Sequence, residues 1–331
     1  MARLLAVAVF LCWLVGPTLA ASLDATAVNN AEFRAKPAED KIDAAIVKAQ
    51  VLLDKALFSP GEIDGKFAEN TRKALKAFAE AKSLVFQSAL TPELWAKLAE
   101  TSRDAVVVQY TVSESDVKGP FLKRLPPKME DLKSFEALSY TSPREAIAEK
   151  FHMSEALLSA LNPGRKFDLA GETILVANVA NKPAKLTIAR IQVDKSRQTV
   201  KALDQQGALV AFFPATVGSE EKPTPSGTLK VISSDRNPTY RYNPNYRFKG
   251  VRSQHPFKIN PGPNNPVGSH WVGLSGEGYG IHGTATPSKI SKSESHGCIR
   301  LTNWDASLLG SNVKKGIPVD FVDGKQDDRK S

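Results

Sequence analysis

Apolar residues at helical spacing predict a small helical unit near the start of the chain. From Ile42 to Leu57, apolar side chains recur at the period of one helix face. Asn70 or Thr71 is expected to cap a second helix, and Thr91-Pro92 to begin a third. These helices are expected within residues 42–57, 70–78 and 91–98. We therefore predict a three-helix bundle over residues 42–100, preceded by a polar linker at 21–41.

A different order of elements follows the bundle. The pattern indicates a strand, two short helices and a second strand. The expected elements are a strand from Ala105 to Val112, helices capped by Ser142 and Ser154, and a strand from Thr173 to Val179. Residues 101–183 are thus expected to form a βααβ connector with its linker.

Period-two alternation dominates the last part of the chain and predicts strands. The strands are expected at Leu186–Val193, Thr199–Leu203, Leu209–Val217, Thr228–Ile232, Val267–Leu274, Tyr279–Gly283 and Ile317–Val322. Between them, Asp235–Pro266 holds six prolines and six asparagines. These residues are expected to keep helix and sheet from forming, so the segment is either a lid or a disordered tract. Its tyrosines and arginines favour a lid.

These patterns together predict a multidomain α+β protein. It comprises the small bundle, the βααβ connector and a C-terminal β-rich domain over residues 184–323, followed by a charged tail at 324–331. The length of 331 residues is typical of two or three domains. An apolar content of 42% with 24% charged residues excludes disordered, collagenous and polytopic membrane proteins.

The first 20 residues have the pattern of an export signal. Arg3 precedes the apolar stretch Leu4–Val15, and the small residues before Ala20 suit cleavage after it. A membrane anchor is the alternative, but the stretch is shorter than the roughly 20 residues that span a bilayer. Gly16-Pro17 then ends it. We expect an exported protein with no transmembrane anchor after cleavage, located in the periplasm or at the cell wall.

The net charge of +9 favours anionic partners, either nucleic acid or an anionic cell-surface polymer. Export removes nucleic acid from consideration. Cys12 lies inside the signal, so Cys298 is the only thiol expected in the mature protein. A single exported cysteine forms an intermolecular bridge, stays buried and inert, or acts as a nucleophile.

The residues around Cys298 favour a nucleophile. His282 lies sixteen positions before it, and a thiol needs such a base to raise its reactive fraction. The backbone N–H groups of Gly297 and Cys298 suit an oxyanion hole. His296 shares a strand face with Cys298 or contributes only its backbone amide. The alternative is a small buried cysteine and a core histidine.

Other residues near this pair are candidates for substrate contact. Ser295 and Arg300 would bind a substrate carboxylate or orient the loop, although Arg300 is also suited to a structural ion pair. The histidines and Cys298 lack the close paired spacing of zinc ligands, and no phosphate-binding loop is present. We therefore expect no metal and no cofactor.

The stretches Ile281-His282-Gly283-Thr284 and Ser295-His296-Gly297-Cys298-Ile299-Arg300 resemble the L,D-transpeptidase (YkuD) catalytic domain. The resemblance runs from about residue 184 to residue 323. It implies that Cys298 is the nucleophile, His282 the general acid/base and the Gly283 carbonyl the group that orients the imidazole. It further implies an oxyanion hole at Gly297 and Cys298, and acylation by carbapenems. Substrate contacts are expected from Tyr279, Ser295, His296 and Arg300.

The earlier units resemble modules found in cell-wall enzymes. Gly61–Phe67 with the helix that follows is similar to a peptidoglycan-binding domain, although Ala68 and Ala79 depart from its pattern. Ala146–Phe151 and Ala160–Pro163 resemble a LysM module. The alternatives are a helical spacer and a structural connector. Since the bundle offers no nucleophile and base at catalytic spacing, we expect it to bind the wall and do no chemistry.

The sequence therefore predicts an exported enzyme that acts on peptidoglycan stem peptides within the sacculus. Cys298 would attack the L,D bond of a tetrapeptide stem, release D-alanine and pass the acyl group to an amine. That amine belongs to a second stem, a D-amino acid or an envelope protein. An L,D-carboxypeptidase, in which water resolves the thioester, is the first alternative. A non-catalytic wall-binding protein is the second.

Overall fold

The computed structural model describes residues 23–37, 39–179, 184–220, 222–246, 251–295 and 297–324. The expected export signal and most of the expected tail lie outside these residues. Within them, no helix is long and apolar enough to cross a membrane.

The N-terminal part is helical, as the hydrophobic spacing predicts. It contains α1 (Ala25–Asn29), α2 (Ala44–Lys55), α3 (Glu69–Ala81) and α4 (Pro92–Ala99). Asp43 and Thr91 cap α2 and α4 through their side chains. The expected cap of α3 at Asn70 or Thr71 is wrong, because α3 begins at Glu69 after Ala68, which makes no side-chain cap.

The side chains of Asn70 and Thr71 are used elsewhere. Asn70 Nδ2 donates to the carbonyl of Ile290 at 3.1 Å, and Thr71 Oγ1 donates to the carbonyl of Lys66 at 3.0 Å. Both contacts tie the start of α3 to neighbouring loops. The segment expected to be a polar linker also contains α1, which is capped by Asp24.

The middle part follows the expected strand, helix, helix, strand order, with short helices inserted. It contains β1 (Val107–Thr111), α5 (Glu114–Val117), η1 (Met129–Ser134), α6 (Pro143–Lys150), α7 (Glu155–Leu161) and β2 (Thr173–Ala177). β1 and β2 pair antiparallel. Ser142 and Ser154 cap α6 and α7, as predicted.

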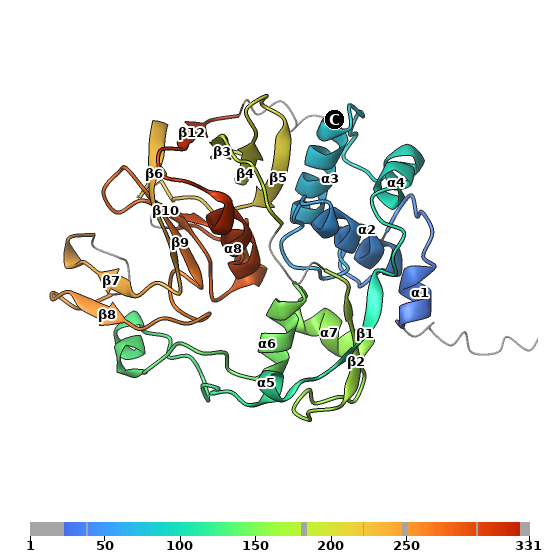
Figure 1. Ribbon diagram of the computed structural model, residues 1–331, viewed down its shortest axis with the longest axis horizontal. Coiled ribbons are helices and arrows are strands. Elements are labelled where there is room, and N and C mark those ends of the chain that lie inside the picture. The colour runs from blue at the N-terminus through green and yellow to red at the C-terminus, as the bar shows by residue number, and fades with distance from the viewer. Residues whose placement is uncertain are drawn as a thin grey trace, which may run out of the picture.

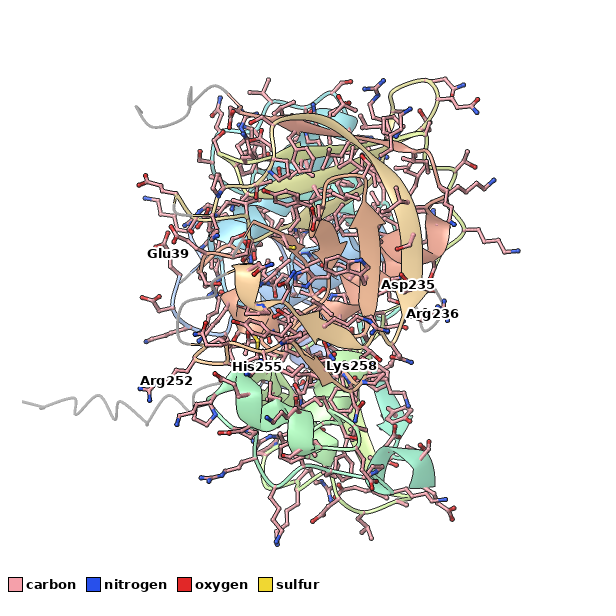
Figure 2. All side chains as sticks on the ribbon, turned by 90° about the vertical axis from the view of Figure 1, so that its left-hand side faces the viewer. Glu39, Asp235, Arg236, Arg252, His255 and Lys258 are labelled. Carbon is pink, nitrogen blue, oxygen red and sulfur yellow. The ribbon has the colours of Figure 1, made fainter. Side chains whose placement is uncertain are left out.

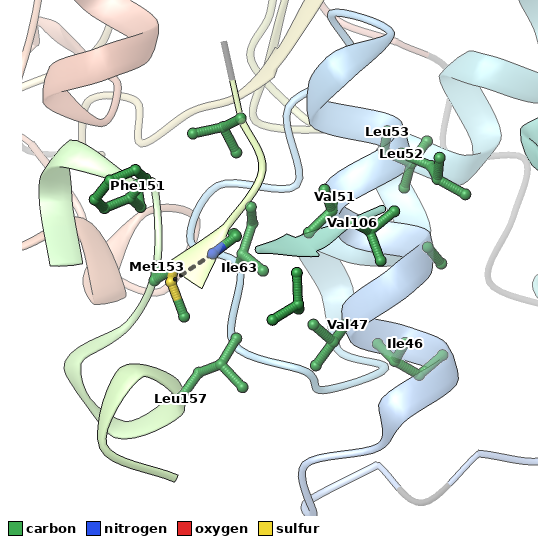
Figure 3. Close-up of a cluster of buried hydrophobic side chains, with 14 of the residues drawn as sticks. Ile46, Val47, Val51, Leu52, Leu53, Ile63, Val106, Phe151, Met153 and Leu157 are labelled. Carbon is green, nitrogen blue, oxygen red and sulfur yellow. Dashed lines mark hydrogen bonds between the residues drawn. The ribbon is translucent and has the colours of Figure 1, made fainter. Parts of the chain in front are cut away.

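One hydrophobic core joins the helical part to the middle part. Figure 3 shows apolar side chains of α2, such as Val47 and Val51, beside Val106, and Met153 and Leu157 on the far side of this cluster. Buried residues from both sides of residue 100 belong to this core, so the two expected modules share one hydrophobic core.

The C-terminal part is built on an eight-stranded sheet with strand order β11-β10-β9-β6-β12-β3-β4-β5. Its buried face carries a second core, against which α8 packs (Figure 1). The elements are β3 (Arg190–Asp194), β4 (Thr199–Leu203), β5 (Leu209–Pro214), β6 (Gly227–Arg236), β9 (His270–Leu274), β10 (Gly280–His282), η3 (Pro287–Lys289), β11 (Ile299–Arg300), α8 (Asn303–Asn312) and β12 (Pro318–Val322). The seven expected strands are present, β4 with the expected bounds and the others with shifted ends, whereas β11 and α8 were not predicted.

The expected lid, Asp235–Pro266, contains regular structure, so the expectation that its prolines exclude sheet is wrong. After the end of β6 it forms β7 (Tyr240–Tyr242), η2 (Pro244–Tyr246) and β8 (Phe257–Ile259), and β7 pairs antiparallel with β8. The ribbon can form because none of the six prolines lies within the paired residues of β7 and β8. Figure 1 shows this ribbon projecting from the sheet.

The ribbon is anchored by the middle part of the chain. The amide of Leu138 donates to the carbonyl of Pro261 at 2.8 Å, and the amide of Asn264 donates to the carbonyl of Leu138 at 2.9 Å. A Cβ added to Gly262 would lie 2.2 Å from the Leu138 oxygen, so only glycine permits this approach. The segment is thus held at its base rather than free along its length.

The helical part also covers the sheet edge at β5. The backbones of Ser59 and Leu57 exchange hydrogen bonds with Phe212, each of 2.9 Å. Phe212 itself belongs to the N-terminal core, and Figure 1 shows α3 beside β5. The covered edge strand is protected from pairing with other chains.

Three carboxyl groups, two of them buried and that of Glu62 half-buried, predict a stability that falls as pH rises. Burial raises the pKa of Glu149 to about 8 and those of Glu62 and Asp305 to about 7. The folded protein therefore holds these protons more tightly than the unfolded chain, and stability is lost as pH rises through the folded pKa values. Above about pH 6.5 the histidines with lowered pKa values are neutral in both states and no longer oppose this trend.

The expected result is a free energy of unfolding that falls from about pH 6.5 to about pH 8 and then levels off, by at most about 1.4 kcal/mol per pH unit for each group that is still protonated in the folded protein but ionised in the unfolded chain. Urea unfolding at several pH values measures it. Glu149→Gln should flatten the slope. Asp116→Asn is the matched control, because hydrogen bonds lower the pKa of Asp116 to about 2 and its charge is constant in this range. An unchanged slope in Glu149→Gln would contradict the assignment.

Candidate active site

Strand register brings the segments that carry the two candidate catalytic residues together. β10 and β11 pair in parallel, with His282 opposite Arg300 and Ile281 opposite Ile299. The two isoleucines are fully buried in the C-terminal core. Because side chains alternate along a strand, His282 and Arg300 lie on the opposite face, and Cys298 stands directly before β11. The thiol and the imidazole both interact with the charge of Arg300, although the chain between them loops away.

His282 is fixed by its backbone neighbour and by an aromatic ring. Its Nδ1–H donates to the carbonyl of Gly283 at 2.6 Å, which leaves Nε2 as the nitrogen with a free lone pair. The imidazole stacks on Trp271 of β9, with ring centroids 5.6 Å apart. Gly280 makes room for this ring, since a Cβ there would lie 2.4 Å from the indole. The geometry presents Nε2 as a proton acceptor.

The surroundings keep both groups uncharged at neutral pH. Burial, and secondarily the charge of Arg300, lower the pKa of His282 to about 3, against the hydrogen bond to Gly283. Burial also raises the pKa of the Cys298 thiol to about 11, although the Gly280 amide and Arg300 lower it. The resting pair is a thiol and a neutral imidazole, so the thiolate must form as the reaction begins.

The thiol is half-buried, and its Sγ–H donates to the carbonyl of Gly278 at 3.4 Å. It is the free cysteine of the described residues. A long thiol hydrogen bond of this kind is weak and is readily exchanged for a new acceptor. The sulfur is therefore held near the chain turn that leads into β10, without being locked there.

The turn before Cys298 depends on glycine and on a buried threonine. Gly297 has a φ of +100°, and a Cβ there would lie 3.0 Å from the ring of Tyr279. The Thr224 hydroxyl donates to the Gly297 carbonyl at 3.1 Å and accepts from the Gly218 amide at 2.8 Å. With the Gly297 carbonyl held in this way, the backbone of the expected oxyanion hole is fixed before substrate arrives.

The expected substrate-contact residues differ in their placement. The Ser295 hydroxyl is buried and donates to the Cys298 carbonyl at 2.5 Å, so it is engaged inside the protein. Tyr279 forms a wall beside Gly297. Arg300 is half-buried, donates to the Glu294 carbonyl at 3.3 Å and interacts with Cys298 and Tyr240 through its charge. His296 lies outside the described residues.

Two residues of the site were not predicted. Trp271 could not be predicted, because it meets His282 by pairing across β9 and β10 and no spacing rule in the sequence links the two residues. Thr224 could not be linked to the site from the sequence, because its bond to Gly297 joins residues 73 positions apart. Among the described residues, no group of three or more His, Cys, Asp or Glu side chains is placed to hold a metal ion.

Comparison with known proteins identifies a family for the C-terminal part of the chain. The model of the YkuD L,D-transpeptidase catalytic domain matches residues 188–320. The Bacillus licheniformis protein that carries the name L,D-transpeptidase YkuD is 31% identical over 54% of this chain and 92% of its own length. Its Bacillus subtilis counterpart is 31% identical over 53% and 90%, and Escherichia coli YbiS is 29% identical over 55% and 61%.

The chain belongs to the YkuD family of L,D-transpeptidases. It is an enzyme of this type. The matched range begins after the helical and middle parts, so the expected peptidoglycan-binding and LysM-like modules stay predictions.

Proposed function

We propose that this protein is an exported peptidoglycan L,D-transpeptidase with Cys298 as nucleophile and His282 as general acid/base. The observation that carries the proposal is the His282 imidazole, whose Nδ1–H is bound to the Gly283 carbonyl and whose strand pairs with the strand that directly follows Cys298. This arrangement combines a proton acceptor with the free thiol of the described chain. It suits acyl transfer through a thioester.

The first half-reaction forms the acyl-enzyme. Nε2 of His282 takes the proton of the Cys298 thiol while Sγ attacks the carbonyl carbon of the stem's L,D peptide bond. The backbone amides of Gly297 and Cys298 stabilise the resulting oxyanion. The intermediate then collapses as the C–N bond breaks and the imidazolium gives its proton to the leaving amine of D-alanine. The products are a thioester on Cys298 and neutral His282.

The second half-reaction transfers the acyl group. An acceptor amine enters where D-alanine left and attacks the thioester carbonyl. His282 takes a proton from that amine, the C–S bond breaks, and the proton returns to the sulfur. A new amide is formed and the enzyme is restored. The lowered pKa of His282 supports this cycle, because the imidazole is in its basic form before each proton transfer.

The ribbon of the expected lid is proposed to take part in substrate binding. Tyr240 of β7 lies close enough to Arg300 to affect its pKa, so the ribbon borders the candidate site. Figure 2 looks toward this ribbon, where Arg252, His255 and Lys258 are exposed. The cationic side chains of Arg252 and Lys258 suit an anionic stem peptide. The net charge of +9 likewise supports work at an anionic wall polymer.

The experiment is mass spectrometry of purified tetrapeptide muropeptides incubated with the enzyme, with and without an amine acceptor. We expect release of D-alanine and, when the amine is present, a product that carries it in place of D-alanine. Products formed only with water would instead show an L,D-carboxypeptidase. Unchanged muropeptides in both arms would contradict the proposal. Cys298→Ala is the matched control and should leave the substrate intact.

A further inference from the structure

The amide of Asn303 lies directly behind the residue that orients His282. Asn303 is the first residue of α8 and is 4% exposed. A Cβ added to Gly283 would lie 2.2 Å from Asn303 Oδ1, so the side chain is packed against the Gly283 backbone. The same oxygen accepts a hydrogen bond from the Ser269 amide at 3.0 Å. Asn303 thus links the end of β10 to the chain entering β9.

The other end of this amide is held from the middle part of the chain. Asn303 Nδ2 donates to Glu149 Oε1 and Oε2 at 3.1 and 3.0 Å and to the Pro263 carbonyl at 3.1 Å. Glu149 belongs to α6, is 9% exposed and lies 154 positions from Asn303. It also precedes the matched catalytic domain, which begins at residue 188. Figure 1 shows α6 beside α8.

The buried carboxyl group of Glu149 must be compensated by hydrogen bonds. Burying a polar group costs free energy unless hydrogen bonds replace those lost to water. The Asn303 amide supplies such bonds, and the Tyr140 hydroxyl donates a further one to Oε2 at 3.4 Å. An apolar residue in α6 would fill this space without that cost, but it would leave Asn303 Nδ2 with the Pro263 carbonyl as its acceptor. The pair therefore fixes the rotation of the Asn303 side chain.

We propose that Glu149 and Asn303 are positioning residues for the general base, acting through Gly283. Glu149 accepts hydrogen bonds from the Asn303 amide, Asn303 Oδ1 packs against the Gly283 backbone, and the Gly283 carbonyl accepts the proton of His282 Nδ1. This inference rests on the proposed function of His282. It assigns to the middle part a contribution to catalysis, where the sequence predicts a LysM-like module or a structural connector.

A role in orienting His282 and a role in folding predict different effects of substitution. If the carbonyl of Gly283 shifts, the imidazole loses the partner that selects its tautomer, and a proton on Nε2 blocks it as a base. Small displacements of a catalytic group lower rates by up to about 100-fold. A merely structural role for Glu149 would lower stability and leave the tautomer and the rate of the folded protein unchanged.

The test uses the full-length mature enzyme and three variants: Asn303→Ala, Glu149→Gln and Glu149→Ala. NMR of selectively labelled histidine nitrogens reports the tautomer of His282 and needs no substrate. The rate of Cys298 acylation by a carbapenem is measured beside it, at a temperature where thermal unfolding shows each variant folded. Glu155→Ala is the matched control, because it removes a carboxylate that pairs with Arg144 on α6, away from Asn303.

We expect wild type and the control to hold the His282 proton on Nδ1. Asn303→Ala and Glu149→Ala should show proton exchange between the two nitrogens and acylate about 10-fold more slowly or worse. Glu149→Gln keeps an acceptor oxygen and should lie between them. An unchanged tautomer with unchanged acylation in both alanine variants would overturn the proposal. Failure of the wild type to process muropeptides would count against the proposed function alone, since the tautomer is read independently.

Discussion

Replacing Cys298 with alanine should abolish covalent capture of a carbapenem completely. The wild-type protein is expected to gain the mass of one inhibitor, because Cys298 is the free thiol of the described residues and His282, the proposed base, is neutral. The only other cysteine of the sequence, Cys12, lies in the expected export signal. Intact-protein mass spectrometry of the two mature proteins measures the difference.

The outcome also tests whether the site has a second nucleophile. Ser295 belongs to the same sequence motif as Cys298 and carries a hydroxyl group. This hydroxyl donates to the Cys298 carbonyl and is buried. It is therefore not placed to replace the thiol. An adduct that persists in Cys298→Ala would show that another residue carries the acyl group.

Loss of the general base is expected to have the next largest effect. His282→Ala should slow acylation by about 100-fold to 10,000-fold, the range typical of a missing general base. The neutral thiol makes this loss severe, because burial raises the pKa of Cys298 to about 11 and little thiolate exists without a base. Stopped-flow measurement of the acylation rate checks it, with the Trp271 stacking partner left intact.

His296→Ala is the matched control for this prediction. A residue that contributes only its backbone amide tolerates loss of the side chain, so acylation should fall distinctly less than in His282→Ala. A larger loss in His296→Ala would mean that the base has been assigned to the wrong histidine.

The wild-type pH profile gives a second reading of the same pair. The pKa of His282 in the resting enzyme is lowered to about 3, so the imidazole is fully in its basic form well below neutral pH. The acylation rate should therefore be nearly constant from about pH 5 to about pH 8, with no inflection near the ordinary histidine value of about 6.5. A rise centred near that value would show that the imidazole is charged in the resting enzyme.

Local features of the fold could be predicted from the sequence. Thr91, Ser142 and Ser154 cap helices where they were expected to, because a cap is decided by a few neighbouring residues. The strands of the sheet were likewise found from their alternation. Helix α8 was missed, although Thr302 with Asp305 three positions later is a start signal of the same kind.

Features that join distant parts of the chain could not be predicted. Nothing in the spacing of Glu149 and Asn303 indicates that they meet, because their contact depends on how α6 packs against α8. The two residues of β11 are too few to show a period. The ribbon within Asp235–Pro266 was missed because its many prolines and asparagines were expected to prevent sheet. The prolines in fact lie outside the paired residues of β7 and β8.

The candidate site shows the same division. His282, Gly283 and Cys298 were found because the motif is contiguous around each of them. Trp271 and Thr224 reach the site from other strands and turns, through the sheet register and through a side-chain bond. The sequence therefore indicated the groups proposed to react, and the structure adds the groups that hold them.

The most direct test of the account is to trap the acyl-enzyme on its own substrate. A tetrapeptide muropeptide is mixed with the enzyme, quenched in acid within the first turnover, and digested for peptide mapping. The account predicts one thioester, on the peptide that contains Cys298, with the mass of the stem less D-alanine. Release of D-alanine with no adduct on that peptide, or with the adduct on another residue, would contradict it.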